Sequence, residues 1–199
     1  MIKNIIFDFG DVFINLDKMA TARAMEKYGF RGITPELDEI FKNYEMGKMG
    51  SDEFLERTNI LFPTATKKDL IEAWNAILLD FPEERLQFLE ALHVENKYRL
   101  FLLSNTNEIH IENERQKMAE RFVRFEKSFE VFYLSYEMGK RKPNKDIFEQ
   151  VLDENKLIAE ETFFIDDLKE NTDAAQKLGI KTWNLRVGKE DVIQLKKYL

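Results

Sequence analysis

The chain contains no cysteine, which excludes disulfide bonds and thiolate chemistry. It has two histidines, His93 and His110, which are too few for a multi-histidine zinc cluster. No stretch approaches the roughly 20 apolar residues that cross a bilayer, and Asp8 interrupts the first apolar run too early for a signal peptide. We therefore expect a cytoplasmic protein with no membrane partner.

The sequence also lacks an excess of positive charge. Its 30 lysines and arginines stand against 37 aspartates and glutamates, which gives a formal net charge of −7. This balance provides no basic surface for nucleic acid, so no nucleic-acid partner is expected. If such an acidic protein bound a phosphate, it would have to offset the negative charge with cationic side chains placed at the binding site or with a metal ion.

Apolar and aromatic side chains are abundant by contrast. Hydrophobic residues make up 44% of the 199 residues, and phenylalanine alone occurs 17 times. Such a composition forms a substantial core and argues against disorder. The length suits one domain, or a core with a smaller insert.

Five short apolar runs are predicted to be buried strands. Each run is continuous rather than alternating, as in a sheet that helices cover on both faces. Helical patterns lie between most of the runs, for example over residues 147–152. We therefore predict an α/β fold with a Rossmann-like, doubly wound parallel sheet. The runs are residues 5–7, 100–103, 131–134, 163–165 and 182–185.

Residues 17–88 interrupt this alternation because they contain no convincing strand. They contain amphipathic stripes instead, over residues 37–44 and 70–78. We predict an all-helical insert over residues 17–88, with residues 1–16 and 89–199 forming the α/β core.

Polar side chains follow three of the predicted strands: Asp8, Ser104–Thr106, and Asp166 with Asp167. Because ligands bind beyond the carboxyl ends of parallel strands, these groups are expected to meet in one crevice. Carboxylates, a hydroxyl and backbone amides suit a hard cation such as Mg²⁺ and a phosphate. Each group alone is also ordinary turn chemistry, but the adjacent acids repel each other unless a cation offsets their charge.

The chain resembles the haloacid dehalogenase-like superfamily in four motifs that occur in order. Any one motif is weak, whereas four at plausible spacing are specific. Residues 17–88 then correspond to the helical cap that follows the first motif in many members. Residues 45–54 resemble a bacterial subgroup that includes α-D-glucose-1-phosphate phosphatases. The motifs are residues 5–12, Leu103-Ser104-Asn105, Lys142 within residues 139–143, and residues 164–167 with Asn171.

This resemblance implies a Mg²⁺-dependent phosphatase that acts on a small phosphorylated metabolite, such as a hexose 1-phosphate. Asp8 would attack phosphorus and form an aspartyl-phosphate that water hydrolyses, and Lys142 would hold Asp8 in line. The implied Mg²⁺ ligands are Asp8, Asp166 and the carbonyl of Gly10; the implied phosphate contacts are Ser104, Asn105 and Lys142; the implied supporting residues are Asp167, Asp11 and Asn171.

One position departs from the pattern of the superfamily. Most of its phosphatases carry a second aspartate two residues after the nucleophile, as general acid and base, and this chain has Gly10 there. Such catalysis is typically worth about 10²–10⁴-fold. A substrate with a good leaving group, such as an anomeric sugar oxygen, would need it less. Asp11, the substrate itself or water are the other candidates for the proton transfer.

Two other functions compete with the phosphatase hypothesis. A haloacid dehalogenase proper uses the same nucleophile without a metal, although it would gain little from the paired acids Asp166 and Asp167. A non-catalytic binding or regulatory protein on the same fold is favoured by Gly10 and disfavoured by the intact Asp8 and Lys142. Phosphoryl transfer to another acceptor is also open, and the sequence predicts no particular oligomeric state.

Several polar residues are expected to be structural. His110 is predicted to lie on a helix surface, and His93 within a helix. Glu45 is assigned equally to the substrate side of the cap and to an exposed helix end. Glu112, Glu114, Arg115 and Lys117 are predicted to form a solvated helix face.

Overall fold

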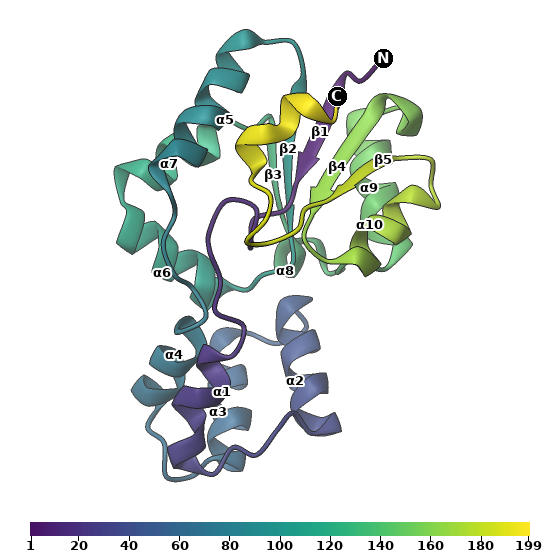
Figure 1. Cartoon of the computed structure of the whole chain (residues 1–199). Coiled ribbons are helices and arrows are strands. Elements are labelled where there is room, and N and C mark those ends of the chain that lie inside the picture. Colours follow the sequence, from purple (N-terminus) through teal and green to yellow (C-terminus); the bar gives the residue numbers. More distant parts are fainter.

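A five-stranded parallel sheet forms the centre of the larger lobe (Figure 1). The computed structural model describes residues 1–199. The strand order is β3-β2-β1-β4-β5, which confirms the predicted α/β fold. The strands are β1 (Asn4–Phe7), β2 (Arg99–Ser104), β3 (Val131–Leu134), β4 (Thr162–Asp166) and β5 (Lys181–Asn184).

The central strand β1 is buried over its whole length, which explains its continuous apolar sequence. Alternate side chains point to opposite faces of a sheet. Ile5 and Phe7 accordingly join one hydrophobic cluster, whereas Ile6 joins another. The first face is covered by α5 (Glu83–Glu95), α7 (Glu120–Lys127) and the 3-10 helix η3 (Val192–Lys197), and the second by α9 (Lys145–Asn155) and α10 (Lys169–Gln176).

A smaller, all-helical lobe lies beyond the carboxyl ends of the strands (Figure 1). It has its own hydrophobic cluster, separate from those of the sheet. Helix starts here follow capping rules: the Thr34 side chain accepts a hydrogen bond from Leu37, and Thr66 and Asp69 form a capping box. The helices are α1 (Ala20–Met25), η1 (Glu26–Tyr28), α2 (Pro35–Glu45), α3 (Ser51–Leu61) and α4 (Lys67–Asn75).

Two chain segments that run side by side connect the lobes. Asn15 exchanges backbone hydrogen bonds with Leu79 and Asp80, each of 2.9 Å, and Leu16 pairs with Leu78. Leu78 was expected on a helical stripe, but α4 ends at Asn75. We propose that this double linker, near residues 15–17 and 77–80, separates the core from the cap, and residues 20–75 are called the cap below.

The predicted boundary after residue 88 falls inside α5. Leu86 and Leu89 of that helix are fully buried in the same cluster as β1, so α5 packs with the core. An apolar pattern in a helix shows that one face is buried, but it does not show which lobe buries that face.

The remaining helices lie near the junction of core and cap or at the far end of β4. Helix α6 (Glu108–Met118) begins directly after the loop that follows β2 and contacts α4 of the cap. The other two are α8 (Ser135–Met138) and η2 (Ala159–Glu161). No helix in the structure combines the length and the apolar character that crossing a membrane requires.

Candidate active site

A cavity of about 290 Å³ opens where the carboxyl ends of β1, β2 and β4 face the cap. Asp8 directly follows β1, and its backbone N–H donates to the Ile165 carbonyl of β4 at 2.9 Å. Ser104 is the last residue of β2, and Asp166 is the last residue of β4. The sequence-predicted residues that line the cavity are Asp8, Gly10, Ser104, Asn105, Lys142, Asp167 and Asn171.

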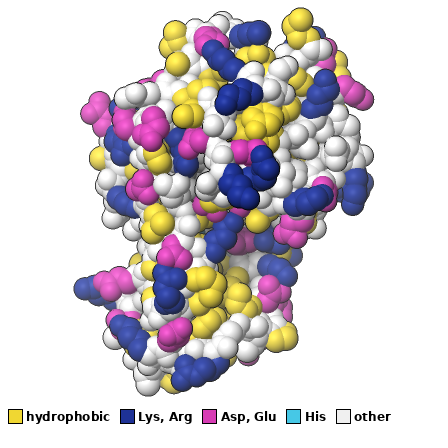
Figure 2. Space-filling model, viewed as in Figure 1, with side chains coloured by type: hydrophobic (Ala, Val, Ile, Leu, Met, Phe, Trp, Pro, Cys, Tyr) yellow, Lys and Arg dark blue, Asp and Glu magenta, His cyan; other side chains and the backbone are white.

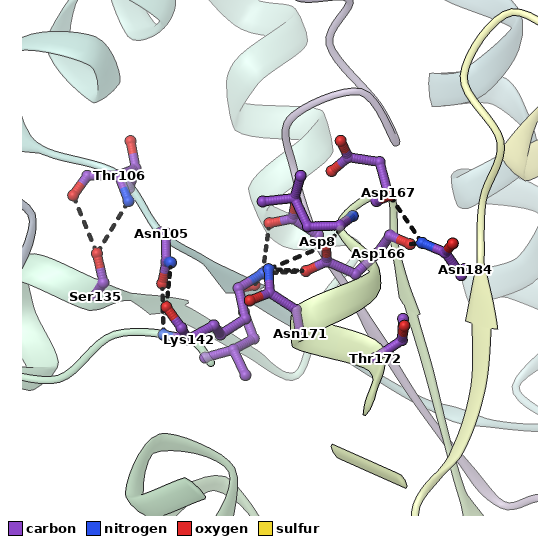
Figure 3. A network of polar contacts seen from close by, with 12 residues as sticks. Asp8, Asn105, Thr106, Ser135, Lys142, Asp166, Asp167, Asn171, Thr172 and Asn184 are labelled. Atoms are coloured by element: carbon purple, nitrogen blue, oxygen red, sulfur yellow. Dashed lines mark hydrogen bonds and ion pairs between the residues drawn. The ribbon is translucent and has the colours of Figure 1, made fainter. Parts of the chain in front are cut away.

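The Lys142 ammonium group lies at the centre of this site (Figure 3). Its Nζ donates to Asp8 Oδ1 at 2.8 Å, to Asp166 Oδ2 at 2.7 Å and to the Leu103 carbonyl at 2.8 Å. The side chain is 1% exposed, and its three N–H groups match these three acceptors. Lys142 therefore fixes the relative positions of two buried carboxylates.

Asn105 holds the backbone of Lys142 in place. The Lys142 N–H donates to Asn105 Oδ1, and Asn105 Nδ2 donates to the Lys142 carbonyl, both at 2.9 Å (Figure 3). This side chain is therefore occupied. The Asn105 backbone N–H makes no backbone hydrogen bond, so it is the group of this residue that is free to contact a phosphoryl oxygen.

Ser104 presents the other predicted phosphate contact. The residue is buried, lines the cavity, and its hydroxyl makes no hydrogen bond to another residue of the chain. A hydroxyl both donates and accepts, so Ser104 can bind an anionic oxygen that enters the cavity.

Three acids cluster beside Lys142. Carboxylate oxygens of Asp8, Asp166 and Asp167 lie within 4.8 Å of one another. Asp166 is fully buried and accepts from the Leu168 N–H at 2.8 Å and from Asn171 Nδ2 at 3.1 and 3.0 Å. Such a cluster of oxygens offers the hard donors that Mg²⁺ prefers.

Two further oxygens suit a cation at this position. Asn171 Oδ1 is buried and has no hydrogen-bond partner. The Gly10 carbonyl accepts no backbone hydrogen bond, and Gly10 lines the same cavity. An unpartnered buried oxygen is costly unless a water or an ion satisfies it. The residues present therefore fit a divalent cation.

The pKa values of the site reflect its burial. Burial raises the pKa of Asp8 to about 7, and Asp166 adds to this effect, while the Lys142 ammonium opposes it. Burial alone would lower the pKa of Lys142, but Asp166 and Asp8 raise it above its ordinary value. A second positive charge near Asp8 would favour its carboxylate form.

The position two residues after Asp8 has no room for a side chain without rearrangement. A Cβ atom on Gly10 would lie 2.8 Å from Cδ1 of Leu16. The Asp11 carboxylate accepts from the Leu16 N–H at 3.0 Å and pairs with Lys18 at 3.0 Å. Asp11 also lines a different cavity from that of Asp8.

Lys18 links two of the predicted supporting acids. Its Nζ lies 2.6 Å from Asp167 and 3.0 Å from Asp11. The residue lies just before α1, so it connects the cap side of the double linker to the acidic cluster. No sequence motif pointed to this residue.

Glu112, Arg115 and Lys117 of the predicted solvated face on α6 are exposed, but Glu114 of that face is buried and His110, expected on the helix surface, is half-buried. The His110 and Glu114 side chains line the cavity, and Glu114 is 1% exposed with an unpartnered Oε2. Burial raises the pKa of Glu114. Their spacing of four residues, directly after the strand-end loop, was the signal that they share one face.

His110 is held in one neutral tautomer. Its Nε2 lies 3.1 Å from the Trp74 carbonyl, which can only accept, and its Nδ1 accepts from Asn107 Nδ2 at 3.1 Å. Burial lowers the pKa of His110 to about 4. Both ring nitrogens are thus engaged within the chain.

Because folded His110 stays neutral, the free energy of unfolding should decrease in mild acid. The ordinary pKa of histidine is 6.5, so the unfolded chain gains a proton between pH 6.5 and 4 that folded His110 does not. The stability supplied by His110 is therefore present above pH 6.5 and is lost as the pH falls to about 4, by up to about 3 kcal/mol. Urea unfolding of His110→Gln should show a shallower loss over this range. His93→Gln, which keeps His110, should retain that slope; equal slopes in wild type and His110→Gln would contradict the prediction.

The cap contributes Glu45 to the cavity. This residue ends α2, and its carboxylate accepts from Arg141 Nε at 3.1 Å and Nη2 at 3.0 Å. Burial raises the pKa of Glu45, although Arg141 opposes the shift. The ion pair joins the cap to the loop that carries Lys142.

Comparisons with known proteins show the family of this chain. Residues 5–185 match the model of the haloacid dehalogenase-like hydrolase family. The chain is 30% identical over 190 residues to D-ribitol-5-phosphate phosphatase of Bacteroides thetaiotaomicron, covering 92% of this chain and 91% of that protein.

Two solved structures extend the comparison. A haloacid dehalogenase family enzyme of Bacteroides thetaiotaomicron, in complex with magnesium and inorganic phosphate, has a TM-score of 0.85 and 37% identity, covering 96% of this chain and 97% of that one. L-2-haloacid dehalogenase of Xanthobacter autotrophicus has a TM-score of 0.62 and 17% identity, covering 98% of this chain and 82% of that one, and shares the fold alone.

The match spans both the core and the cap. It confirms the resemblance and the predicted class of hydrolase, whereas the glucose-1-phosphate phosphatase subgroup stays a prediction. The chain belongs to the haloacid dehalogenase-like hydrolase family.

Proposed function

We propose that this chain is a Mg²⁺-dependent phosphatase that acts on a small phosphorylated metabolite, with Asp8 as the nucleophile. The observation that carries the proposal is the buried Lys142 ammonium shared by Asp8 and Asp166, beside a third acid. A similar enzyme that binds magnesium and phosphate, and a relative that is a phosphatase, support it.

The residues that would hold Mg²⁺ are Asp8, Asp166 and the Gly10 carbonyl, with Asp167 and Asn171 close by. When bound, the ion offsets the repulsion between a carboxylate and a phosphate dianion. Lys142 supplies part of the same compensation from within the chain, and it keeps Asp8 pointed at the cavity.

Asp8 forms a bond from its carboxylate oxygen to phosphorus while the ester P–O bond breaks and the organic alcohol leaves. A water molecule then attacks the phosphorus of the aspartyl-phosphate, which releases inorganic phosphate and restores Asp8. The Ser104 hydroxyl and the Asn105 N–H bind the phosphoryl oxygens through both steps. Gly10 cannot supply the proton that the leaving oxygen needs, so water or the substrate supplies it.

Removal of the metal tests this proposal. Wild-type protein should hydrolyse members of a panel of phosphate monoesters with Mg²⁺, lose that activity in excess EDTA and recover it when Mg²⁺ is restored. The measurement is release of inorganic phosphate. Activity that survives EDTA and releases halide from 2-haloacids would instead identify a metal-independent dehalogenase. Binding of Mg²⁺ without turnover of any ester would identify a non-catalytic binding protein.

The leaving group is a finer part of the proposal. If the missing acid reflects a good leaving group, sugar 1-phosphates should be hydrolysed faster than the corresponding 6-phosphates, because an anomeric oxygen is less basic. A clear preference for 6-phosphates, or for D-ribitol 5-phosphate as in the relative, would contradict this explanation of Gly10.

A further inference from the structure

A second cavity, of about 230 Å³, lies within the cap. Of the 16 residues that line it, 11 are hydrophobic. They come from α1, α2, α3, α4 and the loops that flank these helices. Figure 2 shows hydrophobic side chains gathered on the face of the smaller lobe between α1 and α2. The apolar lining includes Met25, Phe41, Phe54, Leu70 and Trp74.

This apolar cavity adjoins the candidate active site. Four residues line both cavities: Lys18, Glu45, Ile77 and His110. A phosphoryl group beside Asp8 would therefore have its organic part directed across these residues and towards the cap.

The few polar groups of the apolar cavity are already paired within the chain. Thr58 donates to the Phe54 carbonyl at 2.7 Å, and Thr21 to the Trp74 carbonyl at 3.4 Å. Both His110 nitrogens are engaged, and the Trp74 indole N–H donates to Asn107 at 3.2 Å. Hydroxyl groups of a sugar or polyol would find few free partners here, and unpaired buried hydroxyls are costly.

The two charged residues at the junction are paired as well. Lys18 contacts Asp167 and Asp11, and Glu45 contacts Arg141. These two residues therefore lie at the polar end of the apolar cavity, next to the candidate phosphate site, and the rest of its lining in the cap is mostly apolar.

We propose, resting on the function proposed above, that the cap cavity binds an apolar organic group of the substrate, and that the substrate class is aryl phosphate monoesters, whose phenolic leaving oxygen is less basic than an alkyl one and so needs the acid missing at Gly10 less. A cavity of about 150 Å³ holds a benzene molecule. The volume of about 230 Å³ therefore accommodates a short alkyl chain or a single ring. Apolar area removed from water supplies the binding free energy.

Non-hydrolysable alkylphosphonates test the cavity without relying on turnover. Calorimetric titration of wild-type protein with Mg²⁺ should show tighter binding of hexylphosphonate than of methylphosphonate, by roughly 100-fold or more, because each buried methylene is worth about fourfold. Equal affinities would overturn the proposal. Affinity that rises with alkyl length, without hydrolysis of any phosphate ester, would support the apolar binding site and contradict the proposed phosphatase function.

Ala22→Leu narrows the cavity from α1 and has a matched control on the same helix. It should weaken hexylphosphonate binding about tenfold or more and leave methylphosphonate binding unchanged. Ala24→Leu, also half-buried on α1 but outside the cavity lining, should change neither affinity. Unchanged hexylphosphonate affinity in a folded Ala22→Leu protein would overturn the proposal.

A substitution at an exposed residue avoids any question of folding. Ile33 lines the cavity and is 65% exposed, whereas Ile60 is 77% exposed and lies outside the lining. Ile33→Asp should weaken hexylphosphonate binding about fivefold or more, because the hexyl group of the ligand then contacts a solvated carboxylate. Ile60→Asp should leave this affinity unchanged. Equal affinities of these two variants would overturn the proposal.

Discussion

Asp8→Asn should reduce phosphate-ester hydrolysis by at least about 10⁴-fold while the protein remains folded. An amide of the same shape can keep a hydrogen bond with Lys142, but it lacks the anionic oxygen that attacks phosphorus. Because burial and Asp166 disfavour the negative charge of Asp8, its loss should not lower the free energy of unfolding. Initial rates of phosphate release with Mg²⁺, beside urea unfolding, measure both effects.

Asp11→Asn is the matched control for this substitution. Asp11 is as buried as Asp8 and belongs to the same loop, but it lines a different cavity and pairs with Lys18. Its amide variant should retain most of the hydrolytic rate. Retention of activity by Asp8→Asn, or an equal loss in Asp11→Asn, would remove Asp8 from its role as nucleophile. A phosphorylated protein species in wild type, absent from Asp8→Asn, would identify the covalent intermediate directly.

The strands could be predicted because each apolar run coincides with a strand to within one residue. The run at 163–165 became β4 (Thr162–Asp166), and the run at 131–134 is β3. A strand buried on both faces leaves a continuous apolar signature. The order of the strands in the sheet cannot be read from these apolar runs. That order places β1 between β2 and β4, and this brings the polar ends of the three strands together.

The residues on α6 show what sequence patterns could not reveal. Glu114 lies among charged neighbours, as a solvated residue does, and yet it is buried. Its helix packs against α4, and Lys117 of the same helix donates to the Leu79 carbonyl of the double linker. Likewise, residues 140–142 form one basic run, and only the tertiary structure distinguishes the half-buried Lys140 from the fully buried Lys142. Burial of a charged side chain depends on what packs over it, and that is decided by contacts distant in sequence.

Lys142→Met should destabilise the protein by about 3–5 kcal/mol at pH 7, because it leaves two buried carboxylates without their cation. Lys140→Met is the matched control, since Lys140 is half-buried and its ammonium group hydrogen-bonds only the Asp146 carbonyl, at 3.4 Å. That variant should unfold at nearly the wild-type urea concentration. Lys142→Met should also lose most of its phosphatase activity, because Asp8 is no longer oriented.

The pH and metal dependence of Lys142→Met separate an electrostatic deficit from a packing defect. Without the ammonium, the pKa of Asp8 in the folded state rises further above that of the unfolded chain. Wild-type Asp8 itself has a pKa of about 7, so both folded proteins hold this proton below pH 7 and only the variant keeps it above. The variant therefore loses stability with rising pH over a range in which wild type no longer does, and the deficit relative to wild type should grow between pH 7 and pH 9.

Mg²⁺ should restore part of the lost stability, since a ligand of the folded state stabilises it by mass action. The restoration should be larger in Lys142→Met than in wild type, because the ion then compensates carboxylates that have no other cation. Urea unfolding at both pH values, with and without Mg²⁺, measures these differences. A deficit that is the same at both pH values and indifferent to Mg²⁺ would mean that Lys142 acts through packing. Dependence on both would mean that the lysine and the metal neutralise the same acids, Asp8 and Asp166, from two sides.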